Sequence, residues 1–268
     1  MSTVLALLLA LLASPPAGDA AVAGSRRALR VCADPNNMPF SNARGEGLEN
    51  ALARLVARDL DADLTYTWLP QRRGFVRNTL AAGRCDVMME VPVGFARAAT
   101  TRAYYRSSYA FVYRADRYHG LRSFDDPRLR RLRIGVQTIG DDYANSPPAD
   151  ALARRGLARN VVGYSVYGDY SSEAPLSAIV DAVARGDIDV AVVWGPAAGW
   201  LARRQAVPLA VVPLEEDRGE PRTSRLSFAI AMGVRHDDND LRAQLDAVIA
   251  RHKGDIDRLL GRFHVPHL

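Results

Sequence analysis

Gly83-Arg-Cys-Asp86-Val87 is the stretch that decides the fold, because it returns 103 residues later as Gly186-Asp-Ile-Asp189-Val190. A second echo lies at the same offset, where Leu29-Arg30-Val31 returns as Leu132-Arg133-Ile134. In each copy the glycine is expected to end a helix, and the Asp-Val pair to begin a strand. Two matches in the same order and at the same offset indicate two similar α/β units.

Both units are predicted to alternate strands with helices. In the first unit we expect strands at 29–33, 64–68 and 86–91, separated by helices at 47–60 and 75–83. The third of these strands is apolar almost throughout, which is typical of a strand covered on both faces. The alternation predicts parallel sheets with right-handed connections.

Two long apolar runs are predicted to join the units. Residues 109–114 lead from the first unit toward the second, and residues 226–234 lead back. The helical segment 238–263 should then pack on the first unit. The sequence thus predicts an α/β fold of two Rossmann-like lobes joined by two crossover strands, with a cleft between the lobes. The predicted boundaries are 24–110 for the first part of lobe 1, 111–225 for lobe 2, and 226–268 for the return strand and C-terminal helices of lobe 1.

The cleft should be lined by loops that follow the carboxyl ends of the strands. One of them, CADPNNMPFSN at 32–42, has two prolines that limit its flexibility and several amides that donate and accept hydrogen bonds. Other loops bring aromatic and arginine side chains, which anchor many protein interfaces. A single aromatic ring at a strand end, however, more often packs at the rim. The candidate cleft residues are Asp34, Asn36, Asn37, Phe40, Trp68, Gln71, Arg72, Arg73, Phe75, Glu90, Tyr104, Tyr105, Gln137, Asp141 and Trp194.

Glu90 differs from the other candidates because it is a carboxylate at the end of a buried strand. Burial raises the pKa of a carboxyl group, and a raised pKa is one requirement for a general base. The alternative is an ion pair with an arginine such as Arg72 or Arg73. We expect the ion pair, because the sequence offers no second acid or base to complete a catalytic site.

The first 23 residues have the pattern of a cleaved export signal. An apolar run at 4–13 is too short to span a bilayer, and Ala21-Val22-Ala23 fits the small-residue cleavage rule. The alternative, a buried core helix, would not carry leucine and alanine on every face. No later segment is long and apolar enough for a membrane helix, so we expect a periplasmic mature chain without a membrane span.

The two cysteines, Cys32 and Cys85, fall in strands that should be neighbours. An even pair in an oxidising compartment suggests a disulfide. Neighbouring strands lie about 4.8 Å apart, which is within reach of a disulfide if the register agrees. The alternative is two buried thiols in adjacent strands.

The formal net charge is +5, and it comes from many arginines and a single lysine, Lys253. This excess suits an acidic partner, and it is too scattered to indicate nucleic acid. The five histidines lack metal-ligand spacing, and the chain has no haem-attachment motif, phosphate loop or serine-hydrolase elbow. The sequence therefore predicts no metal, no cofactor and no catalytic residue.

Several long blocks resemble a known family. They are LRVCADPNNMPFSN (29–42), TWLPQRRGFVRNTLAAGRCDV (67–87), ATTRAYYRSSYAFV (99–112), GYSVYGDY (163–170) and AVARGDIDVAVVWGP (182–196). Their order resembles type II periplasmic solute-binding proteins, and more narrowly the MoxJ/XoxJ-type proteins associated with quinoprotein dehydrogenases. The resemblance implies a periplasmic partner of a PQQ-dependent methanol or alcohol dehydrogenase, which assists maturation or activation of that enzyme.

Amino-acid-binding proteins that resemble this chain grip the ligand's carboxylate with an arginine that would fall near Gly94 here. In this chain the segment VPVGFAR (91–97) has its arginine three positions later, at Arg97, and no threonine precedes it. We therefore expect the cleft to take a larger, partly apolar object, such as a segment of the partner. Two other functions stay open, a solute receptor of an ABC importer and a dehydratase-type enzyme on the same fold.

Overall fold

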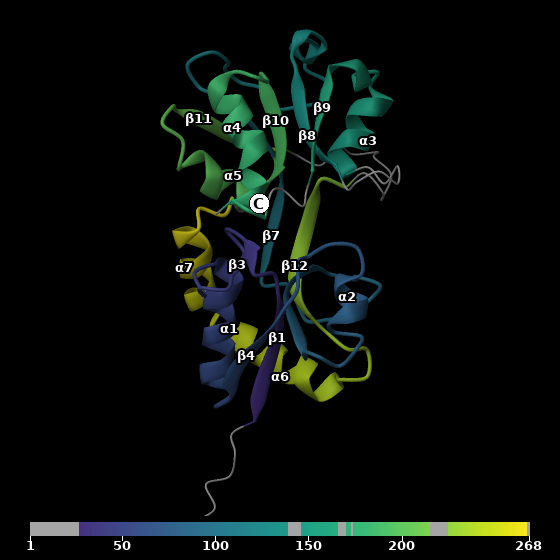
Figure 1. Ribbon diagram of the computed structural model, residues 1–268, viewed down its shortest axis with the longest axis vertical. Helices are drawn as coiled ribbons and strands as arrows, with labels where there is room; N and C mark the ends of the chain where they lie inside the picture. Colours follow the sequence, from purple (N-terminus) through teal and green to yellow (C-terminus); the bar gives the residue numbers. More distant parts are fainter. Residues whose placement is uncertain (1–26, 139–145, 166–169, 173, 215–224, 267–268) are drawn as a thin grey trace, which may run out of the picture.

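The computed structural model describes residues 27–138, 146–165, 170–172, 174–214 and 225–266. The predicted export signal and Asp141 lie outside the described residues. Figure 1 shows two lobes stacked along the long axis, with two long strands running between them. The predicted α/β fold of two lobes and two crossover strands is confirmed, whereas the residue boundaries of the lobes stay a prediction.

Lobe 1 is a sheet covered by helices. Its strand order is β4-β1-β5-β12-β7, in which β1 is parallel to β4 and β5, and β12 is antiparallel to its neighbours. The strands are β1 (Ala28–Ala33), β4 (Asp63–Trp68), β5 (Val87–Pro92), β7 (Tyr105–Arg114) and β12 (Ser227–Val234), with the two-residue strands β2 (Asn36–Asn37), β3 (Ser41–Asn42) and β6 (Ala99–Thr100). The helices are α1 (Leu48–Asp59), α2 (Phe75–Asn78), α6 (Asn239–Arg251) and α7 (Lys253–Arg262).

Lobe 2 repeats this strand order. The order β9-β8-β10-β7-β11 has the same sequence of parallel strands followed by an antiparallel crossover strand. Its strands are β8 (Ile134–Thr138), β9 (Val161–Ser165), β10 (Val190–Trp194) and β11 (Leu209–Pro213). Its helices are α3 (Pro147–Arg154), α4 (Ala178–Arg185) and α5 (Gly195–Ala202), with the short 3₁₀ turns η1 (Pro127–Arg131), η2 (Ala158–Asn160) and η3 (Pro175–Ser177).

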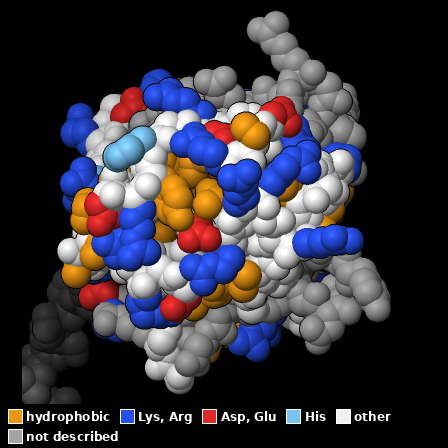
Figure 2. All heavy atoms as spheres, turned by 90° about the horizontal axis from the view of Figure 1, so that it is seen from above, with side chains coloured by type: hydrophobic (Ala, Val, Ile, Leu, Met, Phe, Trp, Pro, Cys, Tyr) orange, Lys and Arg blue, Asp and Glu red, His pale blue; other side chains and the backbone are white. Residues whose placement is uncertain are grey.

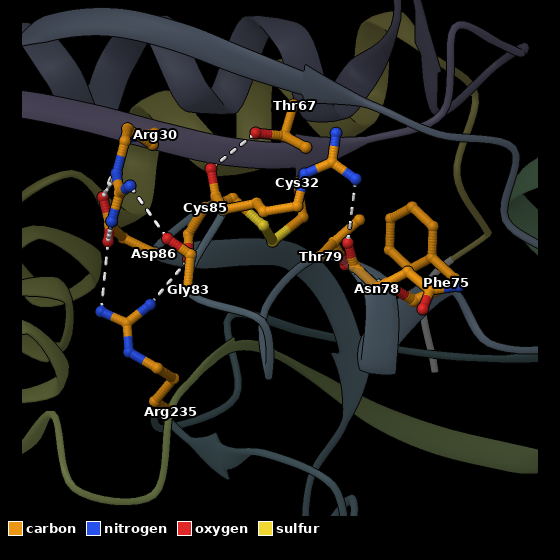
Figure 3. The surroundings of a disulfide bond; sticks show 11 residues. Arg30, Cys32, Thr67, Phe75, Asn78, Thr79, Gly83, Cys85, Asp86 and Arg235 are labelled. Atoms are coloured by element: carbon orange, nitrogen blue, oxygen red, sulfur yellow. Dashed lines mark hydrogen bonds and ion pairs between the residues drawn. A yellow bond between two sulfur atoms is a disulfide. The ribbon is translucent and has the colours of Figure 1, made fainter.

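The repeated arginine and aspartate join the same pair of strands in each lobe, β1 with β5 in lobe 1 and β8 with β10 in lobe 2. In lobe 1 the Arg30 guanidinium donates to both carboxylate oxygens of Asp86, at 2.9 and 2.6 Å, and to the Gly83 carbonyl at 2.9 Å. The Arg30 backbone N–H also donates to Asp86. Figure 3 shows these contacts beside the disulfide, with Arg235 as a second cation on Asp86.

Lobe 2 makes the same set of contacts. The side chain and backbone N–H of Arg133 donate to Asp189, and its side chain also donates to the Gly186 carbonyl at 2.7 Å. Gly186 has a φ of +85°, and Gly83 has a φ of +67°, a region that glycine adopts without strain. The repeated sequence pattern thus forms the same local structure in both lobes.

The predicted helix over 75–83 is wrong in length, because α2 ends at Asn78. Thr79 leaves the helical conformation, and its hydroxyl donates to the Phe75 carbonyl at 2.6 Å. This turn directs Leu80 into the small apolar cluster around the disulfide. The crossover strand β7 also begins earlier than the predicted 109, because residues 105–108 pair with β12 in lobe 1.

The predicted disulfide between Cys32 and Cys85 is confirmed. The two Cα atoms lie 5.3 Å apart, and both cysteines are almost fully buried. The bond joins the end of β1 to the residue that precedes Asp86. It therefore links β1 to the start of β5, as the Arg30–Asp86 contact also does (Figure 3).

The C-terminal helices pack on lobe 1, as predicted. One apolar cluster combines the buried face of α1 with buried side chains of β1, β5, β12, α6 and α7. In α1 this face is formed by Leu48, Leu52, Leu55 and Val56, which recur at helical spacing. Among the described residues, no helix combines the length and the apolar character needed to cross a membrane.

Candidate functional site: the contact between the lobes

The loop that follows β1 reaches into lobe 2. Asn36-Asn37 pairs with Ser41-Asn42 as a small hairpin, and the peptide bond between Met38 and Pro39 is cis. Met38 and Phe40 are both 8% exposed, and they belong to an apolar cluster made mainly of lobe 2 side chains. The loop therefore fills part of the space between the lobes with its own side chains.

Asp34 lies at the centre of a polar contact between the lobes. The Asp34 side chain is buried, and it accepts hydrogen bonds from the backbone N–H groups of Asn36, at 2.8 Å, and Gln71, at 2.6 Å. From lobe 2, the Tyr170 hydroxyl donates to the same carboxylate. Burial and the hydrogen bond to Asp34 raise the pKa of Tyr170. The hydroxyl thus stays a donor over the whole physiological range.

Two further residues of lobe 1 contact the same part of lobe 2. The Asn36 side chain donates to the carbonyls of Ser172, at 2.8 Å, and Tyr170, at 3.3 Å. The Arg72 guanidinium lies over the Tyr170 ring, 4.8 Å from its centroid. We call Asp34, Asn36, Arg72, Tyr170 and Ser172 the interlobe latch.

Beside the latch, Glu90 receives hydrogen bonds from one residue of each lobe. Its Oε1 atom accepts from the Tyr105 hydroxyl at 2.6 Å and from Trp194 Nε1 at 3.4 Å. Its Oε2 atom is shielded from solvent and has no hydrogen bond. The expected ion pair with Arg72 or Arg73 is wrong, because Glu90 points to the aromatic residues at the ends of β7 and β10.

The surroundings of Glu90 are acidic and aromatic. Burial raises the pKa of Glu90 to about 7, although the hydrogen bonds from Tyr105 and Trp194 act in the opposite direction. Glu49, in the first turn of α1, has a pKa raised well above its usual value by burial and by the charges of Glu90 and Asp34. The Trp194 ring also makes edge contacts with the rings of Tyr109 and Phe228. Carboxylates beside aromatic faces are suited to a cationic group.

Other predicted site residues support this region from within lobe 1. Asn37 donates to the Gln71 side chain at 3.0 Å, next to the latch. Tyr104 is buried, and its hydroxyl donates to the Met89 carbonyl at 2.8 Å. Trp68 stacks on Tyr66, with 4.5 Å between the ring centroids, and packs on the lobe 1 core.

The remaining predicted residues lie in other surroundings. Phe75 is buried in the apolar cluster at the disulfide (Figure 3), and Arg73 lines a surface hollow with Arg77 and Arg97. Gln137, at the end of β8, lines a cavity of about 420 Å³ on the lobe 2 side, together with Ser172. Within the described parts of the chain, no group of three or more His, Cys, Asp or Glu residues is arranged to hold a metal ion.

Sequence reasoning missed the lobe 2 half of the latch and the role of α1. Tyr170 and Ser172 follow β9, so the rule that ligand loops follow parallel strands could have selected them. Glu49 stands in the first turn of a helix, where an acidic residue is usually explained by the helix dipole. Its proximity to Glu90 depends on the tertiary fold.

Three known proteins are similar to this chain over most of its length. Protein MoxJ of Methylorubrum extorquens strain AM1 is 30% identical over 251 residues, which cover 90% of this chain and 81% of that protein. The crystal structure of the periplasmic binding protein XoxJ from Methylobacterium extorquens AM1 is 38% identical, with a TM-score of 0.73, and the match covers 90% of this chain and 99% of that one.

The crystal structure of MxaJ from Methlophaga aminisulfidivorans MPT is 28% identical, with a TM-score of 0.78. That match covers 90% of this chain and the whole of the other chain. No protein-family model matches this chain.

Proposed function

Because the chain belongs to the MoxJ/XoxJ family of periplasmic binding proteins, we propose that it is a periplasmic accessory protein of a PQQ-dependent methanol or alcohol dehydrogenase. In this proposal it assists maturation or activation of the dehydrogenase, and its interlobe cleft binds a segment of that partner. Residues 1–23 direct export and are then removed.

The kind of side chain that lies between the lobes supports the proposal that a segment of the partner binds there. The described groups there include the carboxylates of Asp34 and Glu90 and the rings of Tyr105 and Trp194. An α-carboxylate ligand would be repelled by these carboxylates. A basic, partly apolar segment of polypeptide would instead gain ion pairs and aromatic contacts.

Binding in the cleft requires the latch to open. Each latch hydrogen bond stabilises the closed form by about 1 kcal/mol, so an entering segment must replace several of them. A protein segment can do so because it brings its own backbone and side-chain donors, and a specific protein interface buries at least about 1,000 Å². A single amino acid has far fewer groups to offer.

The raised pKa of Glu90 does not by itself make this an enzyme. A general base must reach the proton that it removes. Here Oε1 already accepts from Tyr105 and Trp194, and Oε2 is shielded. The geometry favours a binding role for this carboxylate.

The test is complementation of a strain that lacks this gene. The double variant Asp34→Asn/Glu90→Gln removes the two cleft carboxylates while keeping their shapes. We expect it to lower dehydrogenase activity in periplasmic extracts at least about threefold, because the basic groups of the bound segment then have no carboxylate to pair with. The matched control is Asp237→Asn/Asp240→Asn, which removes two exposed carboxylates from the surface of lobe 1 and should act as wild type.

Two results contradict the proposal. One is equal dehydrogenase activity with and without the gene. The other is micromolar binding of a common amino acid or organic acid in isothermal titration calorimetry, which would identify a solute receptor.

A further inference from the structure

Arginines are scattered along the sequence, but in the folded chain ten of them lie in two segments at the end of lobe 2 that is farthest from lobe 1. Strand β7 leaves lobe 1 and ends at Arg114, so the following loop lies at that far end (Figure 1). Residues 114–133 contain seven arginines and three aspartates, and residues 154–160 add three arginines. These two segments, which we call the arginine end, carry +7 at neutral pH, whereas the whole chain carries +5.

The aspartates of the arginine end are already paired. Asp116 pairs with Arg114, Asp126 with Arg128, and Asp125 with Arg155, at 2.5 to 2.8 Å. The two aspartates of the neighbouring turn pair as well, Asp187 with Arg185 and Asp189 with Arg133.

Five exposed arginines of the arginine end have no such partner among the described residues, Arg117 among them. The side chains of the other four, Arg122, Arg130, Arg131 and Arg159, likewise make no hydrogen bond or ion pair with any described residue. Figure 2, which looks down on this end, shows arginine side chains around a small apolar area. A charged group on another molecule would complete this surface.

The backbone that carries these arginines is held in place. The Asn160 side chain donates to the carbonyls of Arg130 and Leu132, both at 3.0 Å, and so ties η2 to η1. Arg128 donates to the carbonyls of His119, at 2.8 Å, and Gly120, at 3.3 Å. The backbone thus fixes the positions from which these arginine side chains extend, and their guanidinium groups are suited to pairing with carboxylates of a partner.

We propose that the arginine end of lobe 2 docks an acidic face of the partner protein, as a surface separate from the interlobe cleft. This inference rests on the proposed function, because it takes the dehydrogenase as the partner. The arginine end lies at the start of β8 and β9, whereas the latch residues Tyr170 and Ser172 follow the end of β9. Docking there leaves the latch free to open onto a segment of the same partner.

The use of arginine at this surface favours a protein as the binding partner over a membrane. Guanidinium groups form bidentate contacts with carboxylates, and the chain uses arginine throughout, with a single lysine. An anionic bilayer surface presents fluid charge and needs no such framework.

The test measures binding of the purified dehydrogenase to three forms of the full-length mature protein. The first is wild type, and the second is Arg122→Gln/Arg130→Gln/Arg131→Gln/Arg159→Gln. The third, the matched control, is Arg58→Gln/Arg77→Gln/Arg242→Gln/Arg262→Gln, which removes the same charge from lobe 1. We expect the lobe 2 variant to bind at least about tenfold more weakly at low salt, with a shallower salt dependence, and the control to stay within about twofold of wild type.

Each other outcome has a defined meaning. Equal loss in both variants, or no loss in either, overturns the docking surface but leaves the proposed function standing. No binding of the dehydrogenase by wild type contradicts the proposed function itself. If the lobe 2 variant binds the dehydrogenase normally but loses binding to phosphatidylglycerol vesicles, the surface faces a membrane and the proposal is overturned.

Discussion

Replacing Glu90 by glutamine should make the protein more stable at neutral pH. The burial that raises the pKa of Glu90 from 4.5 to about 7 means that the folded chain binds this proton more tightly than the unfolded chain does. The free energy of unfolding must therefore fall as the pH rises from about 4.5 to about 7. A shift of this size corresponds to about 3 kcal/mol, since each pKa unit is about 1.4 kcal/mol.

The variant Glu90→Gln imitates the protonated carboxyl group at every pH. Its Oε1 still accepts from Tyr105 and Trp194, while its amide nitrogen takes the place of the shielded Oε2. An unpaired buried amide costs about 1 kcal/mol or more, and a protonated carboxyl group at that position carries a similar cost. The two proteins should thus be about equally stable at pH 4, and the variant should gain up to about 3 kcal/mol above pH 7.

The assay is thermal unfolding, followed by circular dichroism, across this pH range. For a chain of this length 3 kcal/mol corresponds to a Tm difference of about 6–12 °C. The matched control is Glu46→Gln, because hydrogen bonds from Asn42 and Arg44 lower the pKa of that exposed glutamate, so the variant should not gain stability as the pH rises. A Tm difference between Glu90→Gln and wild type that is the same at all pH values would refute the reasoning.

Four further predictions concern the fold and the latch. Reduction of the Cys32–Cys85 bond, which closes a loop of 53 residues, should lower the free energy of unfolding by about 4 kcal/mol, measured by urea titration with and without reductant; an unchanged midpoint would contradict it. Asp86→Asn should cost about 2 kcal/mol at pH 7, and its effect should vanish at low pH. Burial acts to raise the pKa of Asp86, but its arginine hydrogen bonds lower it overall, so this stability is present above the usual carboxyl pKa and is lost as the pH falls through the lowered value. The equivalent Asp189→Asn should cost less, because its arginine contact is longer, and equal losses would argue against this ranking. Tyr170→Phe should weaken the latch by about 1 kcal/mol and shift the molecule toward an open form with a larger radius of gyration in small-angle scattering; the same radius as wild type would show that this hydroxyl does not hold the lobes together.

Local patterns explain which elements could be predicted. The boundaries of α1, β1, β4 and β5 follow from apolar periodicity and from turn residues, which act within a few positions along the chain. The end of α2 at Asn78 was not predicted, because Phe75, Val76 and Leu80 are at helical spacing and all pack in the disulfide cluster, although Thr79 leaves the helical conformation.

The candidate site, too, could be predicted only in part from the sequence. The loop over 32–42 was recognisable from its prolines and amides, and it does meet the other lobe. The partner of Glu90 was predicted wrongly, because the choice between an arginine and Trp194 depends on how two distant strands are placed.

The amino-acid sequence by itself indicated the two matched units, the adjacency of the first strand and the strand at 86–91 in lobe 1, and a disulfide between Cys32 and Cys85. Each of these depends on contacts inside one unit, and the repeated arginine, glycine and aspartate form the same contacts in both. Only the tertiary structure decided what lies between the units. The Asp34–Tyr170 contact joins residues 136 positions apart and exists only when the two lobes close on each other, an arrangement that no local pattern in the chain encodes.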